Sequence, residues 1–180
     1  MNVLFDSIRP DDHMQGDRTV TCSLVEYGDY ECPSCAQIQP VVKRLQRKFG
    51  SRLSFVFRDF PLGEIHPWAE KAAEVAEFAG KHGKFWEIHD LLFANQDRFS
   101  DDLFLKLVDK VGLSYPQLQI ALERNTFQPQ VLAEVQAGLR SGVNGTPTFF
   151  IDEERYDGSL DYDSLADAIT RALSENIRYD

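Results

Sequence analysis

The spacing of hydrophobic residues changes twice near the start of the chain and predicts a strand, a helix and a second strand. Residues 19–27 are rich in alternating β-branched and aromatic side chains, which is typical of a strand. Hydrophobic residues then recur every three or four positions from Cys35 to Phe49, as on one face of a helix, and Gly50 ends the pattern. Residues 53–58 return to strand character. This order forms a βαβ unit, whose strands we expect to be parallel.

A helical pattern of about eighty residues follows, and β character then returns. Helices are expected over residues 66–80, 84–94, 101–111 and 127–141. Ser100 is the expected N-cap of the third, and Ser114 begins another short helix. Two strands and a final helix are expected over residues 148–151, 155–156 and 162–174. The pattern predicts an α/β fold in which βαβ and ββα halves flank a helical insertion.

Composition narrows the class of protein. A chain of 180 residues with 43% hydrophobic side chains can bury one sizeable core, which excludes disorder as its main state. The net charge of −10 argues against binding nucleic acid or anionic lipid. No apolar run is long enough to span a bilayer. Residues 1–10 lack the features of a secretory leader, so we expect a cytoplasmic protein, or a periplasmic or extracytoplasmic one if a leader or anchor precedes this chain.

Two of the three cysteines carry the candidate chemistry. Cys32 and Cys35 enclose Pro33 and Ser34 where the first strand gives way to the helix. Cysteines three residues apart on a first helical turn have β-carbons about 5–6 Å apart, close enough to form a disulfide after small adjustment. The helix N-terminus is expected to lower the pKa of the Cys32 thiol, whereas Cys35 lies on the apolar stripe. We therefore expect Cys32 to exchange disulfides and Cys35 to resolve the mixed disulfide.

Other interpretations of the cysteines and histidines are weaker. A zinc site needs four ligands, and the sequence has no second cysteine pair. The histidines are scattered without ligand-like spacing, so no metal site is expected; they are His13, His66, His82 and His89. Cys22 is expected to be a buried hydrophobic residue.

Two glutamates precede the motif. Glu26 lies six residues before Cys32 on the first strand, where a carboxylate could exchange a proton with Cys35 through water. The alternative, a strand-end side chain that reaches solvent, is equally open. Glu31 directly precedes Cys32 and is expected to be solvated, where its negative charge would oppose thiolate formation.

Two later motifs remain open to interpretation. Pro147 begins the later strand, and a cis bond there would leave the backbone of Thr146 facing outward, able to pair with an extended substrate. His66 precedes a proline at the start of the insertion, where it is either a helix-entry residue or a catalytic or metal-binding one. A group of aromatic residues is expected to form the core of the insertion: Trp68, Phe85, Trp86 and Phe93.

Together these motifs resemble the DsbA-like branch of the thioredoxin superfamily over residues 19–174. The matching segments are LVEYGDYECPSC, the following helix with Pro40, and SGVNGTPTFF. FVFRDFPL and HPWAEKAAEVAEF are similar to a bacterial DsbA-like subgroup. The resemblance implies one domain over residues 1–180 with a thioredoxin fold around a central mixed sheet. Its core would comprise residues 1–62 and 143–180, with a DsbA-type helical insertion over 63–142.

The resemblance also implies roles for individual residues. Glu26 would be the buried acid of the family and Pro147 its cis-proline, both placed with Cys32 and Cys35 as catalytic residues. Thr146, Pro33 and Ser34 would contact substrate. The implied activity is thiol–disulfide exchange with protein or peptide substrates, with no cofactor beyond the redox-active Cys32–Cys35 disulfide. The redox partner would be thioredoxin, glutathione or a membrane oxidase.

Two departures from the family leave the direction of electron flow open. Pro33-Ser34 lacks the histidine of strongly oxidising DsbA proteins, which predicts a less oxidising couple. Thr146 resembles the corresponding residue of reductases and isomerases. A glutathione-linked or peroxide-responsive enzyme, and a non-catalytic thioredoxin-fold binding module, are the alternative functions.

Overall fold

The computed structural model describes residues 3–20 and 22–176. Its contacts divide the chain into two compact units. The first unit draws on Met1–Tyr27, Gln37–Arg58 and Ala137–Asp180. The second draws on Gly28–Ala36 and Asp59–Gln136. Some helices and strands contribute residues to both units.

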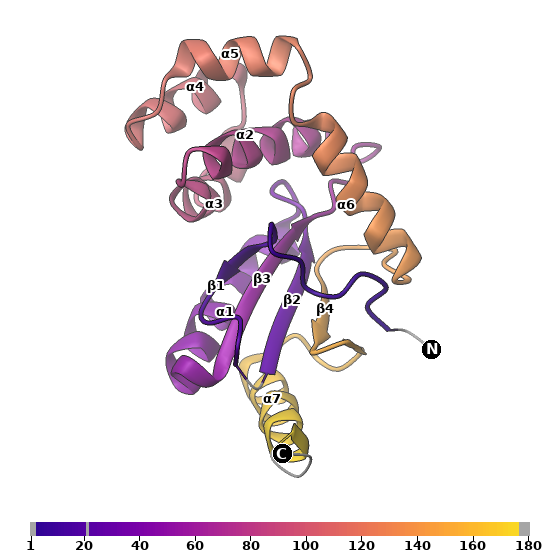
Figure 1. Ribbon diagram of the computed structural model, residues 1–180. Coiled ribbons are helices and arrows are strands. Elements are labelled where there is room, and N and C mark those ends of the chain that lie inside the picture. The colour runs from indigo at the N-terminus through magenta and orange to yellow at the C-terminus, as the bar shows by residue number, and fades with distance from the viewer. Residues whose placement is uncertain (1–2, 21, 177–180) are drawn as a thin grey trace. The chain divides into compact units, whose positions relative to one another are not determined.

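Most of the sheet belongs to the first unit (Figure 1). Its order is β1-β3-β2-β4-β5, and β4 pairs antiparallel with both β2 and β5. The strands are β1 (His13–Gln15), β2 (Cys22–Gly28), β3 (Leu53–Asp59), β4 (Thr148–Ile151) and β5 (Glu154–Tyr156). Four of them confirm predicted strands. The fifth, β1, was not predicted because its three residues show no hydrophobic alternation; its pairing with β3 defines it.

The central strand β2 is buried on both faces, which differs from the predicted alternation. Leu24, Val25, Glu26 and Tyr27 are all fully buried. An alternating strand is expected where one face of a sheet meets water, whereas a strand covered on both sides needs no polar face. Glu26, opposite Phe149 in the ladder with β4, is therefore a buried carboxyl group.

Helix α1 (Pro33–Phe49) confirms the predicted helix, and Gly50 follows it with a positive φ of 54°. Its buried face carries Cys35, Ile38, Val42, Leu45 and Phe49, the stripe expected from the sequence. Pro40 lies inside the helix. The C-terminal helix α7 (Tyr162–Asn176) begins at the predicted residue and contacts β4.

The second unit is built from helices. They are α2 (Ala69–Lys81), α3 (Phe85–Phe93), α4 (Asp101–Lys110), α5 (Tyr115–Glu123) and the first part of α6 (Gln128–Arg140). α2 contacts α3, α4 and α5, and its buried alanines let these helices approach closely (Figure 1). The predicted caps are confirmed: Ser100 Oγ accepts from Leu103 N at 3.2 Å, and Ser114 Oγ accepts from Gln117 N at 3.4 Å.

The aromatic residues expected in the insertion do form part of its core. Phe85 and Phe93 are buried, whereas Trp68 and Trp86 are half-buried. The Trp68 ring packs edge-on against Phe104, with ring centroids 5.9 Å apart. Among the described residues, no helix has the length and apolar character that crossing a bilayer requires.

Candidate redox site

The Cys32–Cys35 motif forms the start of helix α1. Pro33 is the first helical residue, and the carbonyl oxygen of Cys32 accepts from Ala36 N at 3.2 Å. Cys32 therefore occupies the N-cap position, where the helix dipole favours an anion. The three cysteines are free thiols. Cys32 keeps 7% of its surface exposed and Cys35 none, so the first cysteine is the more accessible of the pair.

The loop before the motif is held by a glutamine from the helical unit. Gln96 Nε2 donates to the carbonyl oxygens of Tyr30 and Cys32 at 3.0 and 3.1 Å. The Tyr30 side chain is buried, and its hydroxyl lies 3.1 Å from His89 Nδ1. Sequence reasoning missed all three residues. The only sequence signal was the aromatic Tyr30 two positions before the motif, since nothing along the chain links it to Gln96 or His89.

Asp29 links this loop to His66. Its Oδ2 lies 2.8 Å from His66 Nδ1 and accepts from Leu62 N at 2.8 Å, while its Oδ1 accepts from Glu31 N at 2.7 Å. The backbone N–H of Asp29 also points at Cys35 Sγ, at 3.5 Å. The structure therefore places His66 against a carboxylate, and through Asp29 it belongs to the surroundings of the motif.

The expectation of a solvated Glu31 is wrong. The side chain is half-buried, and its Oε2 accepts from Trp68 N at 2.6 Å. This hydrogen bond satisfies a backbone donor just before helix α2, so the carboxylate ties the residue preceding Cys32 to the start of the insertion.

Glu26 belongs to the first unit, where it is fully buried in β2. Gln39 Nε2 donates to both of its carboxylate oxygens, at 3.3 and 3.2 Å. The alternative of a strand-end glutamate that reaches solvent is therefore wrong.

Thr146 and Pro147 also belong to the first unit. The peptide bond between them is cis, and both residues are half-buried just before β4. Thr148 Oγ1 donates to the carbonyl oxygen of Gly145 at 2.7 Å, which closes the turn that leads into the strand. The predicted site residues are thus distributed over both units, with the two cysteines, Pro33 and Ser34 in the second.

Cys22 is a core residue, as expected. It keeps only 1% of its surface exposed in β2. Burial, together with the negative charge of Asp152, raises the pKa of the Cys22 thiol to about 12. A thiol with so high a pKa carries almost no thiolate near neutral pH and cannot compete in exchange.

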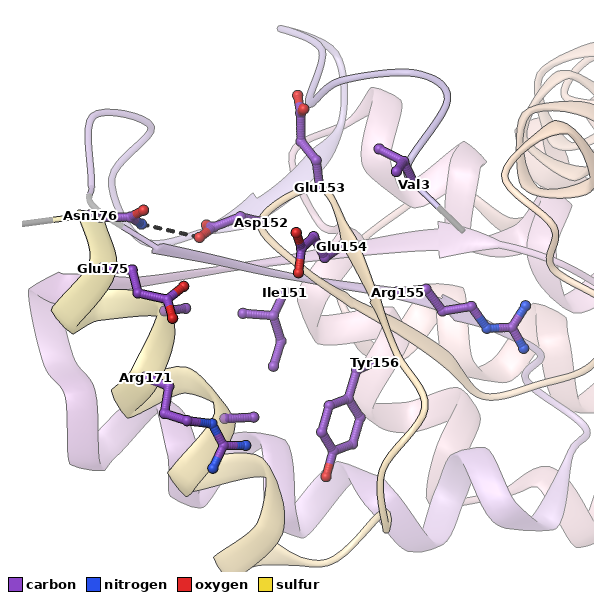
Figure 2. A pocket seen from close by; sticks show the side chains of 12 residues that line it. Val3, Ile151, Asp152, Glu153, Glu154, Arg155, Tyr156, Arg171, Glu175 and Asn176 are labelled. Atoms are coloured by element: carbon purple, nitrogen blue, oxygen red, sulfur yellow. Dashed lines mark hydrogen bonds between the residues drawn. The ribbon is translucent and has the colours of Figure 1, made fainter. Parts of the chain in front are cut away.

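A surface pocket of about 670 Å³ lies in the first unit between β4–β5 and α7 (Figure 2). Carboxylates of Glu153, Glu154 and Glu175 share it with the guanidinium groups of Arg155 and Arg171. None of the predicted site residues lines it. Because acidic and basic groups are mixed in this pocket, it favours no class of ligand. The cysteine motif therefore remains the candidate functional site.

Comparison with known proteins agrees with this geometry. Residues 9–171 match the model of the thioredoxin family. A Na⁺/H⁺ antiporter NhaA 1 of Salinispora arenicola is 38% identical over 168 residues, which are 93% of this chain and 26% of that protein. The corresponding antiporter of Mycobacterium sp. strain KMS is 34% identical over 88% of this chain. The chain thus spans about a quarter of the length of these relatives.

Solved structures give the fold. BdbD from Bacillus subtilis superposes with a TM-score of 0.84 at 23% identity, covering 91% of this chain and 94% of that one. α-DsbA1 from Wolbachia pipientis has a TM-score of 0.83 at 16% identity and covers 96% of both chains. A thioredoxin-like oxidoreductase from Silicibacter pomeroyi reaches 0.76 at 26% identity, covering 92% and 94%. The predicted thioredoxin fold with a helical insertion is confirmed, and the chain belongs to the thioredoxin family, with the architecture of its DsbA-like members.

Proposed function

We propose that this chain is a thiol–disulfide oxidoreductase that exchanges disulfides with protein substrates through Cys32. The observation that carries the proposal is the position of the cysteine pair at the start of α1: Cys32 at the N-cap with 7% of its surface exposed, and Cys35 one turn later with none. The dipole at the helix N-terminus favours a thiolate at Cys32. The Asp29 N–H, 3.5 Å from Cys35 Sγ, offers the second sulfur a donor when it becomes the attacking thiolate.

In the reductive direction, the Cys32 thiolate attacks one sulfur of a substrate disulfide. The substrate S–S bond breaks, a Cys32–substrate disulfide forms, and the released substrate thiolate takes up a proton. Cys35 then loses its proton and attacks Cys32 Sγ, which forms the Cys32–Cys35 disulfide and frees the second substrate thiol. The substrate gains two electrons and the protein loses two. A dithiol partner must then return two electrons to the Cys32–Cys35 disulfide. The same steps in reverse oxidise a substrate dithiol.

Positions shared with the family motifs motivate the remaining roles in this proposal. Glu26 would accept the proton of Cys35, and Thr146 and Pro147 would face an extended substrate, with Pro33 and Ser34 at the exchanging sulfur. No cofactor beyond the cysteine pair is needed for these steps. A reducing role in the cytoplasm agrees with the Pro33-Ser34 dipeptide, which lacks an extra cation to stabilise the reduced form.

Reduction of insulin disulfides by dithiothreitol tests the activity. The wild-type chain should accelerate insulin precipitation, and Cys32→Ser should abolish the acceleration. Cys22→Ser is the matched control because it removes a buried thiol of high pKa, so it should retain the wild-type rate. Equal rates for wild type and Cys32→Ser would refute the proposal. Turnover with glutathione and glutathione reductase, without insulin reduction, would instead identify a glutathione-linked enzyme.

The antiporter relatives support a second candidate function. Segments of these proteins are up to 38% identical to nearly the whole of this chain. A redox module that regulates a membrane transporter through a cysteine of the transporter would explain that similarity. Trapping with Cys35→Ser in membranes that contain such a transporter would yield a covalent complex if this candidate is right. Trapping of soluble proteins alone would exclude it.

A further inference from the structure

Three carboxylates converge inside the second unit, away from the cysteine motif in sequence. Asp59 ends β3, Glu77 lies on α2 and Glu134 on α6. One carboxylate oxygen from each lies within 4.8 Å of the others. The three side chains are buried, with exposed fractions of 1%, 2% and 4%. Residues 75 positions apart in the chain, Asp59 and Glu134, meet here, so the cluster exists only in the folded protein.

Glu77 and Glu134 each have a polar partner in this cluster. Glu134 Oε2 accepts from the backbone N–H of Asp59 at 2.5 Å. Glu77 Oε2 accepts from Gln130 Nε2, one turn before Glu134 on α6. These hydrogen bonds hold the two glutamates in place.

Asp59 is different. Neither of its carboxylate oxygens has a hydrogen-bond partner, although the side chain is almost fully enclosed. Burying an ionised carboxylate without a partner is costly, and two further carboxylates nearby increase that cost. Burial, and then the charges of Glu134 and Glu77, raise the pKa of Asp59 well above its ordinary value. The site therefore requires either a proton or a cation.

We propose that Asp59, Glu77 and Glu134 bind a hard divalent cation. The geometry allows one ion to reach all three residues, because ligand oxygens about 2.1–2.5 Å from a metal lie at most about 5 Å apart. The set contains only carboxylate oxygens, with no thiolate or imidazole, which favours Ca²⁺, Mg²⁺ or Mn²⁺ over zinc or copper. Sequence reasoning sought cysteine and histidine pairs and so missed carboxylates from three separate elements.

The bound cation would join the end of β3 to α2 and α6 within the helical unit. It would replace repulsion among three carboxylates by shared coordination, so it should stabilise the folded state. The cysteine motif contributes no ligand, so cation binding and disulfide exchange can be tested independently of each other.

Thermal unfolding of the full chain tests the site. After treatment with EDTA and dialysis, the melting temperature is measured with Ca²⁺, Mg²⁺ or Mn²⁺ added separately. At a cation concentration about 100-fold above Kd, the expected rise is roughly 5–10 °C for a domain of this size. Asp59→Asn should abolish the rise. Glu74→Gln is the matched control, since Glu74 is a buried carboxyl group on the same helix as Glu77 but outside the cluster.

Elemental analysis of the dialysed wild-type chain gives a readout that does not depend on the variants folding. One equivalent of a divalent cation, displaced by EDTA with loss of the thermal shift, supports the site. Absence of both binding and shift with all three cations would overturn the proposal and leave protons as the neutralising species. Undiminished binding by folded Asp59→Asn would also overturn it.

Discussion

The side-chain amide of Gln39 donates to both carboxylate oxygens of Glu26, at 3.3 and 3.2 Å, inside the first unit. Glu26 is fully buried and Gln39 keeps only 8% of its surface exposed. Gln39 also lies four residues after Cys35, which puts it one turn further along the same face of α1. The amide thus connects the buried acid to helix α1, which also carries Cys35.

Gln39→Ala should therefore weaken both the fold and the exchange reaction. A buried carboxylate that loses its donor costs about 1–3 kcal/mol of unfolding free energy. In the proposed mechanism Glu26 accepts the Cys35 proton, so we also expect a slower conversion of the mixed disulfide when Glu26 loses its partner. Urea unfolding measures the first effect and the lifetime of the mixed disulfide with a model peptide measures the second. Gln37→Ala, an exposed glutamine on the same helix, should change neither; equal effects of both substitutions would contradict this role.

Cys22 should resist alkylation in the folded protein. With a pKa of about 12, its thiolate fraction near pH 8 is roughly a thousandfold lower than for a thiol with the ordinary value of 9.0. In Cys32→Ser/Cys35→Ser, iodoacetamide should leave the native chain unlabelled for hours and label it once in urea, as followed by mass spectrometry. Rapid labelling of the native variant would show that Cys22 is accessible.

The raised pKa of the Cys22 thiol also predicts that the protein loses stability at high pH. The thiol of Cys22 ionises more readily in the unfolded chain than in the folded one, so its contribution is complete below about pH 9. It is lost as the pH rises towards about 12. Cys22→Ala should show a shallower alkaline decline than the wild type when urea midpoints are compared over this window.

Asp12 and Arg58 should govern stability in acid. Arg58 Nε and Nη2 donate to the two oxygens of Asp12 at 3.0 and 2.8 Å, and both side chains are fully buried. Burial acts to raise the pKa of Asp12, but the hydrogen bonds and charge of Arg58 outweigh it and lower the pKa below the usual 3.8. The stabilisation is therefore present above about pH 4 and is lost as the pH falls through the lower folded-state pKa.

Asp12→Ala should cost about 3–5 kcal/mol at neutral pH, because it leaves a buried guanidinium without its carboxylate. The difference from the wild type should shrink in acid. Asp11→Ala, with a side chain that is 78% exposed, should change the unfolding free energy little. A small effect of Asp12→Ala at neutral pH would show that the carbonyl oxygens of Asp6 and Ser7 and the Tyr27 hydroxyl satisfy Arg58 without it.

The two cysteines of the motif should behave differently when each is replaced. Cys35→Ser should accumulate covalent complexes with substrate proteins, because no second thiol can release them, whereas Cys32→Ser should accumulate none. Non-reducing electrophoresis with and without dithiothreitol detects such complexes. Complexes trapped through Cys35 in the Cys32→Ser variant would reverse the proposed roles.

Much of the fold could be predicted because its longer elements follow local rules. The apolar stripe from Cys35 to Phe49 and the caps at Ser100 and Ser114 each depend on a few neighbouring residues, and all three appear in the structure. Strand β1 depends instead on a partner strand some forty residues away, as in the pairing of His13 with Phe57. The residues of β1 alone therefore do not predict a strand.

The surroundings of the cysteine motif were harder to predict for the same reason. Cys32 and Cys35 are recognisable from their spacing alone. Tyr30, Gln96 and His89 meet only after the helices fold, since Gln96 lies more than sixty residues beyond the carbonyl groups it holds. Glu31 looked solvated because a charged residue usually is, whereas its partner is a backbone N–H from another segment.

The assignment of Gly28–Ala36 to the helical unit has a consequence for dissecting this protein. The groups that hold the cysteine loop, Gln96 and His66, come from the insertion, not from the strands. Trimming the chain down to a minimal thioredoxin, by replacing residues 59–136 with a short connector, would therefore keep the two sulfurs but discard their scaffold. The insertion thus supplies residues that hold the cysteine motif in place, and an exchange assay should use the whole chain.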